Sequence, residues 1–243
     1  MSFPRRRESR PNIPYNYLMN ILVFSDTHLY LPFDQKKFNF LKKIISESGQ
    51  VIINGDFFDG YMNKFDEFCK SSWNKLFPLL KDRKTVYIYG NHDQKKFIDK
   101  RVNLFSEIRE ERYRIKINKK NYIFEHGHKT RPAHDIMFTN INWQIKHIGM
   151  ILVHFIRNFL VNTFGNLAIL LLFKPRNKIS KKMIDKFYKP QENEVYFIGH
   201  NHFGEIDLKN HFVSTGAILY GFAQYLTINS TSGKITLHEE WYK

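Results

Sequence analysis

The stretch that decides the fold is ILVFSDTH, residues 21–28, in which an apolar run leads directly into a serine, an aspartate, a threonine and a histidine. The apolar residues predict a buried strand, so the polar residues lie where that strand ends. Asp26 and His28 are two positions apart, and extended backbone points such side chains the same way. The pair therefore offers one oxygen and one nitrogen ligand to a metal, although a single D-x-H is common in proteins.

Four further predicted strands end in the same manner, at residues 51–53, 85–89, 122–125 and 195–198. The polar residues that follow them are Asp56 and Asp59, then Asn91, His92 and Asp93, then His126, and finally His200 and His202. In open α/β sheets, ligands collect at the carboxyl ends of strands, so these distant segments are expected to converge. Mixed nitrogen and oxygen ligands favour Mn, Fe or Zn over Ca. The ordered set therefore predicts a metal centre.

Strands and helices alternate in the first half of the chain, and short strand-like segments fill its last 40 residues or so. This order predicts an α/β domain with a mixed sheet. Helices are expected over residues 35–47, with Asp34 as N-cap, and over residues 65–80. Residues 113–125 are expected to form a hairpin. The lone cysteine, Cys69, excludes an intramolecular disulfide and favours a reducing compartment, which predicts a cytoplasmic protein.

The chain is strongly basic, with a formal charge of +15 and a pI of about 9.7. This balance suits anionic partners such as a phosphorylated substrate, an acidic membrane surface or, less well, nucleic acid. Residues 1–18 contain three consecutive arginines and lack the apolar stretch of a signal peptide. They are predicted to be a disordered basic arm or a start assigned too early, so that the folded domain spans residues 19–243. The sequence does not give an oligomeric state.

The order of the motifs, D-x-H, G-D-x-x-D, G-N-H-D, H and G-H-x-H, resembles the calcineurin-like metallophosphoesterase superfamily over roughly residues 20–228. The resemblance implies packed mixed β-sheets flanked by helices, and two divalent ions, with manganese expected first and iron or zinc as alternatives. It implies that one ion is held by Asp26, His28, Asp56 and His202, and the other by Asp56, Asn91, His126 and His200. Asp56 would then bridge the two ions.

The resemblance also implies a mechanism, in which a hydroxide attacks phosphorus in line. His92 would contact the substrate phosphate and protonate the leaving oxygen, Asp93 would orient His92, and Asp59 would support the ligands. The catalytic candidates are thus His92, Asp93 and Asn91, the last of which is also a ligand. Two such ions lower the pKa of a shared water and clamp the phosphoryl oxygens.

A helical insert, both hydrophobic and basic, is expected over about residues 129–190, where eleven Lys and Arg stand against two Asp. Its apolar residues 148–173 allow a transmembrane span, an ordinary core helix pair, or an amphipathic lid that meets a membrane surface. His154 and Arg157 interrupt the apolar run and argue against a span. His154, Asn158, Asn162 and Asn166 follow one another at spacings of four and form one polar stripe. With the flanking lysines, this stripe favours the lid.

Such an insert makes the chain look most like the UDP-2,3-diacylglucosamine hydrolase branch of the superfamily. That branch implies cleavage of a sugar-nucleotide pyrophosphate in lipid A synthesis, with release of UMP and a lipid monophosphate at the cytoplasmic face of the membrane. Two positions depart from the pattern of this branch. His128 occupies a position that is often acidic in the branch, and Phe203 and Gly204 follow the G-H-x-H motif where the branch tends to have an arginine. The alternatives are a soluble phosphodiesterase or phosphatase acting on nucleotides or nucleic acid, and a non-catalytic scaffold, against which the intact His92 argues.

Overall fold

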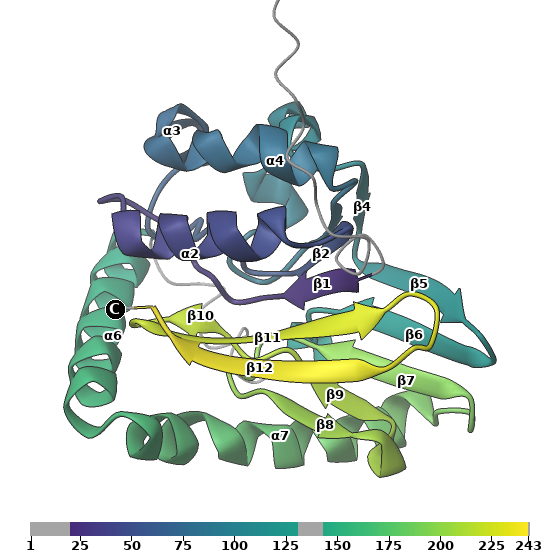
Figure 1. Cartoon of the computed structure of the whole chain (residues 1–243). Helices are drawn as coiled ribbons and strands as arrows, with labels where there is room; N and C mark the ends of the chain where they lie inside the picture. Colours follow the sequence, from purple (N-terminus) through teal and green to yellow (C-terminus); the bar gives the residue numbers. More distant parts are fainter. Residues whose placement is uncertain (1–19, 131–142, 243) are drawn as a thin grey trace, which may run out of the picture.

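Two β-sheets pack face to face with helices on both outer sides, as the computed structural model shows (Figure 1). The structure describes residues 20–130 and 143–242. The predicted basic arm at 1–18 and the predicted first residue of the domain, Met19, lie outside these residues. The predicted fold class, packed mixed sheets flanked by helices, is confirmed.

The first sheet has seven strands in the order β10-β11-β1-β2-β3-β4, and β12 pairs with β11. Its strands are β1 (Asn20–Phe24), β2 (Gln50–Asn54), β3 (Val86–Ile88), β4 (Ile108–Glu110), β10 (Ile218–Leu219), β11 (Phe222–Asn229) and β12 (Ile235–Trp241). β1 to β4 are parallel, whereas β11 is antiparallel to its neighbours β1, β10 and β12. The parallel strands β1 and β2 are covered on both faces, which explains why their central residues are all apolar.

The second sheet has five strands in the order β5-β6-β7-β9-β8. They are β5 (Arg112–Ile117), β6 (Lys120–Glu125), β7 (Glu194–Ile198), β8 (Glu205–Asp207) and β9 (Phe212–Ser214). β5 and β6 form the hairpin predicted over residues 113–125, while β6, β7 and β9 are parallel. Apolar side chains of both sheets, among them Val23, Ile52, Phe124 and Phe197, form one core between them.

The helices on the outer side of the first sheet differ in part from the prediction. α2 (Gln35–Ser46) begins where expected, because the Asp34 side chain accepts a hydrogen bond from the Lys37 backbone N at 3.0 Å. The single helix predicted over residues 65–80 is wrong. Ser71 has extended backbone and caps a new turn through the Trp73 backbone N, so the chain forms α3 (Phe65–Lys70), the 3-10 helix η1 (Ser72–Leu76) and α4 (Phe77–Asp82). Short 3-10 turns occupy Lys95–Phe97, Lys100–Leu104, His128–Thr130 and Leu208–Asn210.

The described part of the predicted insert is a pair of helices, α6 (Trp143–Phe164) and α7 (Asn166–Tyr188), joined at Gly165. α7 runs along the outer face of the second sheet, where its Ile184 packs against Tyr196 and Phe212, and α6 stands along the side of the molecule (Figure 1). In the described parts of the chain, no helix is both long and apolar enough to cross a bilayer. One face of α7 is thus packed on the second sheet, whereas its opposite face is exposed.

Candidate metal centre

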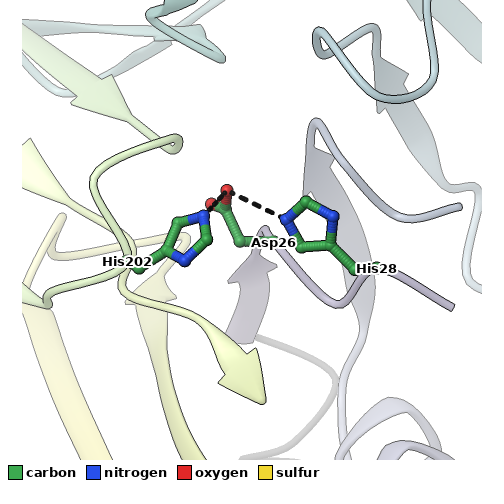
Figure 2. A group of neighbouring side chains, drawn as sticks. All are labelled: Asp26, His28 and His202. Carbon is green, nitrogen blue, oxygen red and sulfur yellow. Dashed lines mark ion pairs between the residues drawn. The ribbon is translucent and has the colours of Figure 1, made fainter. Parts of the chain in front are cut away.

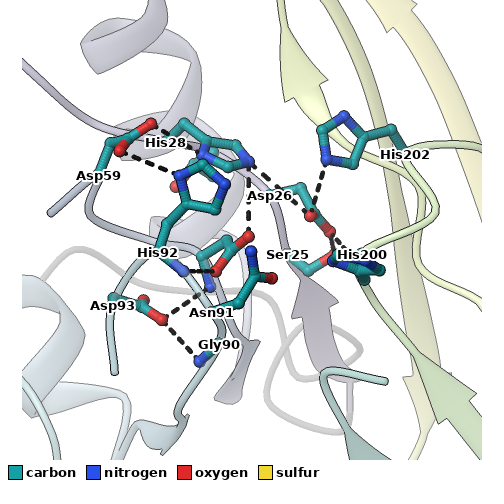
Figure 3. Close-up of polar contacts among 12 residues, drawn as sticks. Ser25, Asp26, His28, Asp59, Gly90, Asn91, His92, Asp93, His200 and His202 are labelled. Carbon is teal, nitrogen blue, oxygen red and sulfur yellow. Dashed lines mark hydrogen bonds and ion pairs between the residues drawn. The ribbon is translucent and has the colours of Figure 1, made fainter. Parts of the chain in front are cut away.

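The five predicted strand ends meet at one edge of the two sheets. Figure 3 shows residues that follow β1, β2, β3 and β7, and His126 after β6 contacts Asn91. Backbone hydrogen bonds join the loops that follow β1 and β2, from the Asp26 N to the Gly55 O at 3.0 Å and from the His28 N to the Asp56 O at 2.9 Å. The loop after β7 is joined to them because the His200 N donates to Asp26 Oδ2 at 2.9 Å. The edge thus holds all of the predicted ligands in one fixed group.

One cluster of candidate ligands consists of Asp26, His28 and His202, all of them buried (Figure 2). Asp26 Oδ1 lies 3.1 Å from His202 Nε2 and 3.9 Å from His28 Nε2. Within the described residues, Asp26 Oδ1 and His28 Nε2 have no hydrogen-bond partner. Buried polar atoms nearly always have a partner, so these two atoms, turned toward each other, fit a bound cation.

A second cluster consists of Asp56, His126 and His200. His126 Nδ1 lies 3.0 Å from the Asn54 carbonyl and donates to it, so Nε2 is the nitrogen that faces the other candidate ligands. That Nε2 lies 3.1 Å from Asp56 Oδ2 and 3.0 Å from the fourth predicted ligand, Asn91 Oδ1. Asp56 Oδ2 also lies 3.7 Å from His28 Nε2, so it stands between the two clusters, as a bridging ligand must.

Burial sets the protonation of three of the histidines. It lowers the pKa of His28, His200 and His202, and nearby positive charges lower each further. Neutral imidazole is the form that binds metals. Burial opposes a charge on His126 as well, but the carboxylates of Asp56 and Asp26 raise its pKa to about 10, so a metal ion would have to displace its proton. The buried carboxylates and the three neutral imidazoles fit divalent cations.

His92 lies on the open side of the two clusters, and its orientation corrects one prediction. Its Nδ1 is 3.0 Å from Asp59 Oδ1, and its ring lies edge-on to His28 with the centroids 4.4 Å apart. Burial opposes a charge on His92, but the carboxylates of Asp59 and Asp56 raise its pKa to about 9. Asp59, predicted only as support for the ligands, also lies 3.2 Å from His28 Nδ1 and so holds both rings.

Asp93 does not orient His92. Its carboxylate accepts hydrogen bonds from the Gly90, Asp56 and Phe57 backbone amides at 2.6, 3.1 and 2.8 Å, and from the Tyr87 hydroxyl. Asp93 is fully buried, whereas His92 is partly exposed, so Asp93 turns into the protein as His92 turns out. Asp93 therefore fixes the loops after β2 and β3 to each other.

The insert contributes residues that were not predicted as part of the site. His154 on α6 is buried, and its ring nitrogens lie 3.0 Å from the Tyr220 hydroxyl and 3.4 Å from Asp59 Oδ2. The polar stripe of α6 held the only indication of this role, since His154 is its first member. The next member of the stripe, Asn158, is exposed instead.

Two arginines of the insert reach the same side of the site. The guanidinium carbons of Arg157 on α6 and Arg176 on α7 lie 5.8 and 5.1 Å from the centroid of the Phe173 ring. That ring is itself 5.3 Å from the His202 ring. Both arginines contribute to the lowered pKa of His202, after the effect of its burial. They therefore place positive charge beside the candidate ligands.

A pocket of about 970 Å³ extends from His28 and His154 between α6, the loop after β1 and the turn between β10 and β11. Aromatic side chains form much of its wall, including Tyr30, Phe33 and Trp73. Phe155 of α6 also lines it. Within the parts of the chain that the structure describes, this pocket offers a large organic group a place beside the candidate ligands.

The ligand loops have unusual backbone. Five of the predicted ligands, Asp26, His28, Asp56, His200 and His202, have φ between 42° and 62°. This left-handed region disfavours most residues that carry a Cβ. Glycines beside them permit close approach, since a Cβ on Gly90 would lie 2.1 Å from Asp56 Oδ1. The loops therefore adopt an unfavourable backbone conformation that brings the candidate ligands together.

A sequence model described as calcineurin-like phosphoesterase matches residues 19–204, which is more than half of the chain. The chain belongs to this family. The match includes every predicted ligand and His92, and it ends just after His202. The family implies hydrolysis of phosphoesters. No curated protein matches the chain in sequence.

Solved structures of this type resemble the chain with low sequence identity. A structure described as a novel archaeal phosphodiesterase is 15% identical, with a TM-score of 0.46, and covers 91% of this chain and 100% of its own. Vps29 of Entamoeba histolytica, complexed with zinc, is 13% identical with a TM-score of 0.46, covering 93% and 100%. YfcE, a phosphoesterase from E. coli, is 15% identical with a TM-score of 0.43, again covering 93% and 100%.

Proposed function

We propose that this protein is a hydrolase that depends on two divalent metal ions and cleaves a phosphodiester or diphosphate bond. The observation that carries the proposal is the position of Asp56 between the two clusters, 3.7 Å from a nitrogen of His28 in one and 3.1 Å from a nitrogen of His126 in the other. When bound there, such ions activate a water for attack and draw charge from the phosphoryl oxygens. We expect manganese to support the activity best.

Protonation of the leaving oxygen falls to a side chain on the open side of the clusters, His92. Asp59 fixes the Nδ1 of His92, so the Nε2 of His92 faces the open side. The raised pKa of His92 keeps a proton on this nitrogen near neutral pH. His92 can therefore donate that proton to the leaving oxygen, a general-acid contribution of typically 10²–10⁴-fold.

The substrate we propose is lipid-linked or a sugar nucleotide, such as UDP-2,3-diacylglucosamine. Arg157 and Arg176 suit a second anionic group, as in a diphosphate, because guanidinium groups bind phosphate oxygens well. The aromatic pocket beside His28 suits an apolar or ring-shaped group on the same substrate. A metal centre, two arginines and this pocket together favour a substrate larger than a simple phosphomonoester.

Hydrolysis assays with purified protein and Mn²⁺ test the proposal, with bis-p-nitrophenyl phosphate and UDP-2,3-diacylglucosamine as substrates. We expect faster turnover of the lipid, loss of both activities in Asp56→Ala, and a 10²–10⁴-fold loss in His92→Gln. Arg157→Gln with Arg176→Gln should reduce hydrolysis of the lipid at least tenfold and leave the simple diester almost unaffected.

The outcomes separate the two levels of the proposal. Hydrolysis of the simple diester and of nucleotides, but not of the lipid, would discard the lipid substrate and favour a phosphodiesterase acting on nucleotides. Absence of all hydrolysis with Mn²⁺, Fe²⁺ and Zn²⁺ would overturn the enzymatic function and favour a scaffold.

A further inference from the structure

The outer side of α6 carries an apolar stripe that no other described element covers. Its members follow one another at spacings of three and four and so share one face of the helix: Ile145, Ile148, Leu152, Ile156 and Phe159. Their exposed fractions run from 46% to 66%. Isolated exposed apolar residues are ordinary, but a continuous row of five large ones marks a surface that binds something.

The start of α7 continues this apolar surface past the turn at Gly165. Leu167 and Leu171 are 55% and 67% exposed, on the side of α7 opposite to its buried residues Ile169 and Phe173. Phe164, just before the turn, is 55% exposed. The turn between the two helices is thus an exposed apolar projection at the edge of the molecule (Figure 1).

The outward face of α7 changes from apolar to basic beyond Leu171. Lys174, Lys178, Lys182 and Lys186 follow at spacings of four and are all exposed. None of these four has an ion-pair partner among the residues that the structure describes. Residues 143–190 as a whole contain nine Lys and Arg against one Asp. The apolar surface is therefore bordered by unneutralised positive charge.

We propose that this surface, the outer face of α6 together with the turn and the lysine row of α7, docks on an anionic lipid bilayer. Apolar side chains enter the interface between headgroups and acyl chains, and the lysines contact the anionic headgroups. A second copy of this chain suits the surface less well, because two copies would bring their lysine rows together with only Asp185, among the described residues of that face, to meet them. The proposal concerns a binding surface outside the metal centre and holds whatever the substrate is.

The position of the surface relative to the pocket has a consequence for access. On α6, Ile151 and Phe155 line the pocket and lie next to the apolar stripe, one step around the helix. Both are themselves 47% and 68% exposed. Docking by the outer face would therefore place the rim of the pocket at the membrane interface.

Co-sedimentation of the full-length protein with vesicles tests this proposal. We expect binding to vesicles of phosphatidylcholine with 30% phosphatidylglycerol, at least tenfold weaker binding to pure phosphatidylcholine, and weakening by 0.5 M NaCl. Leu152→Ser with Phe159→Ser, and separately Lys174→Glu with Lys178→Glu, should each reduce binding at least tenfold. Neither pair touches the metal centre, so hydrolysis of a soluble diester without vesicles should be unchanged.

Matched controls come from elsewhere on the surface. Leu104→Ser with Leu208→Ser removes apolar residues that are 55% and 43% exposed, and Lys42→Glu with Lys75→Glu reverses two exposed lysines. Both controls should bind vesicles as the wild type does.

Equal losses in variants and controls, or no binding to anionic vesicles, would overturn the proposal. A dimer in sedimentation velocity that Leu152→Ser with Phe159→Ser dissociates, without vesicle binding, would assign the surface to a second copy instead. Because the readout is vesicle binding, it stands whether or not the proposed hydrolysis is found.

Discussion

Replacing Lys37 with methionine should stabilise the protein near neutral pH and lose that advantage in alkali. Lys37 is only 6% exposed, and its ammonium donates to the Thr27 carbonyl, between the candidate ligands Asp26 and His28. Burial lowers the pKa of Lys37 from 10.5 to about 7, although Asp34 and Asp59 oppose the shift. Methionine keeps most of the length of the side chain and removes the group that has to be charged or neutralised.

The size of the effect follows from the shift in pKa. Folding lowers the pKa of Lys37 from 10.5 to about 7, and each unit of this shift corresponds to ~1.4 kcal/mol. The charged lysine therefore destabilises the folded state by up to about 5 kcal/mol at and below pH 7. Between these two values the unfolded chain binds more protons than the folded chain, so wild-type stability rises with pH through this window. The methionine variant lacks this pH-dependent destabilisation. It loses instead the hydrogen bond to Thr27, at a cost of about 1–3 kcal/mol at every pH.

Urea unfolding in the presence of a chelator, followed by tryptophan fluorescence at pH 6.5, 8 and 9.5, measures the difference. The free energy of unfolding of Lys37→Met minus that of the wild type should fall by several kcal/mol from pH 6.5 to pH 9.5. Other titrating groups are common to both proteins and cancel. Lys36→Met, at the exposed neighbouring position, should show a difference that is flat with pH. A flat difference for Lys37→Met as well would refute the reasoning.

Three further predictions concern the site. His154→Phe removes the contacts to Asp59 and Tyr220, so kcat for a soluble diester should fall about 10–100-fold. Metal content, measured by atomic emission, should be retained. An unchanged kcat would show that His154 is not part of the site. Gly90→Ala places a Cβ 2.1 Å from Asp56 Oδ1, so metal affinity measured by calorimetry should fall at least tenfold, and wild-type affinity would show that the loop can yield. Chelation should lower the Tm because it leaves the buried Asp26 and Asp56 carboxylates to repel each other. Mn²⁺ should restore the Tm in a concentration-dependent way. A Tm that neither treatment changes would contradict metal binding at these residues.

The parts of the fold that were predictable are those with continuous apolar sequence. β1, β2 and β7 lie within buried sheets, so each has a continuous apolar run of at least three residues, and polar residues mark where each strand ends. β4 and β10 escaped prediction for physical reasons. β4 is a three-residue edge strand with two exposed charged side chains, and β10 has only two residues, which is too short for any periodicity.

The same contrast holds for the candidate site. The predicted ligands could be found because each follows a strand, and the structure brings them together at one edge. The contact to His92 was assigned to Asp93 because of its proximity in sequence, whereas Asp59 makes it, because the loop after β2 crosses to His92 in space. His154 joins the site from a helix 95 residues beyond Asp59, and the polar stripe of α6 indicates a polar face without indicating this contact.

The left-handed backbone at five of the candidate ligands also limits how this centre can change over evolutionary time. Asn, Asp and His are the residues other than glycine that most readily adopt this conformation. A glutamate or a cysteine at Asp26, Asp56 or His202 would bring an added backbone cost of about 1–2 kcal/mol at each position, besides its different reach. Drift toward a thiolate-rich, zinc-selective site would therefore require new loops and not merely new side chains. The turns of the main chain thus confine this lineage to imidazole, amide and short carboxylate donors, and with them to borderline and hard divalent ions.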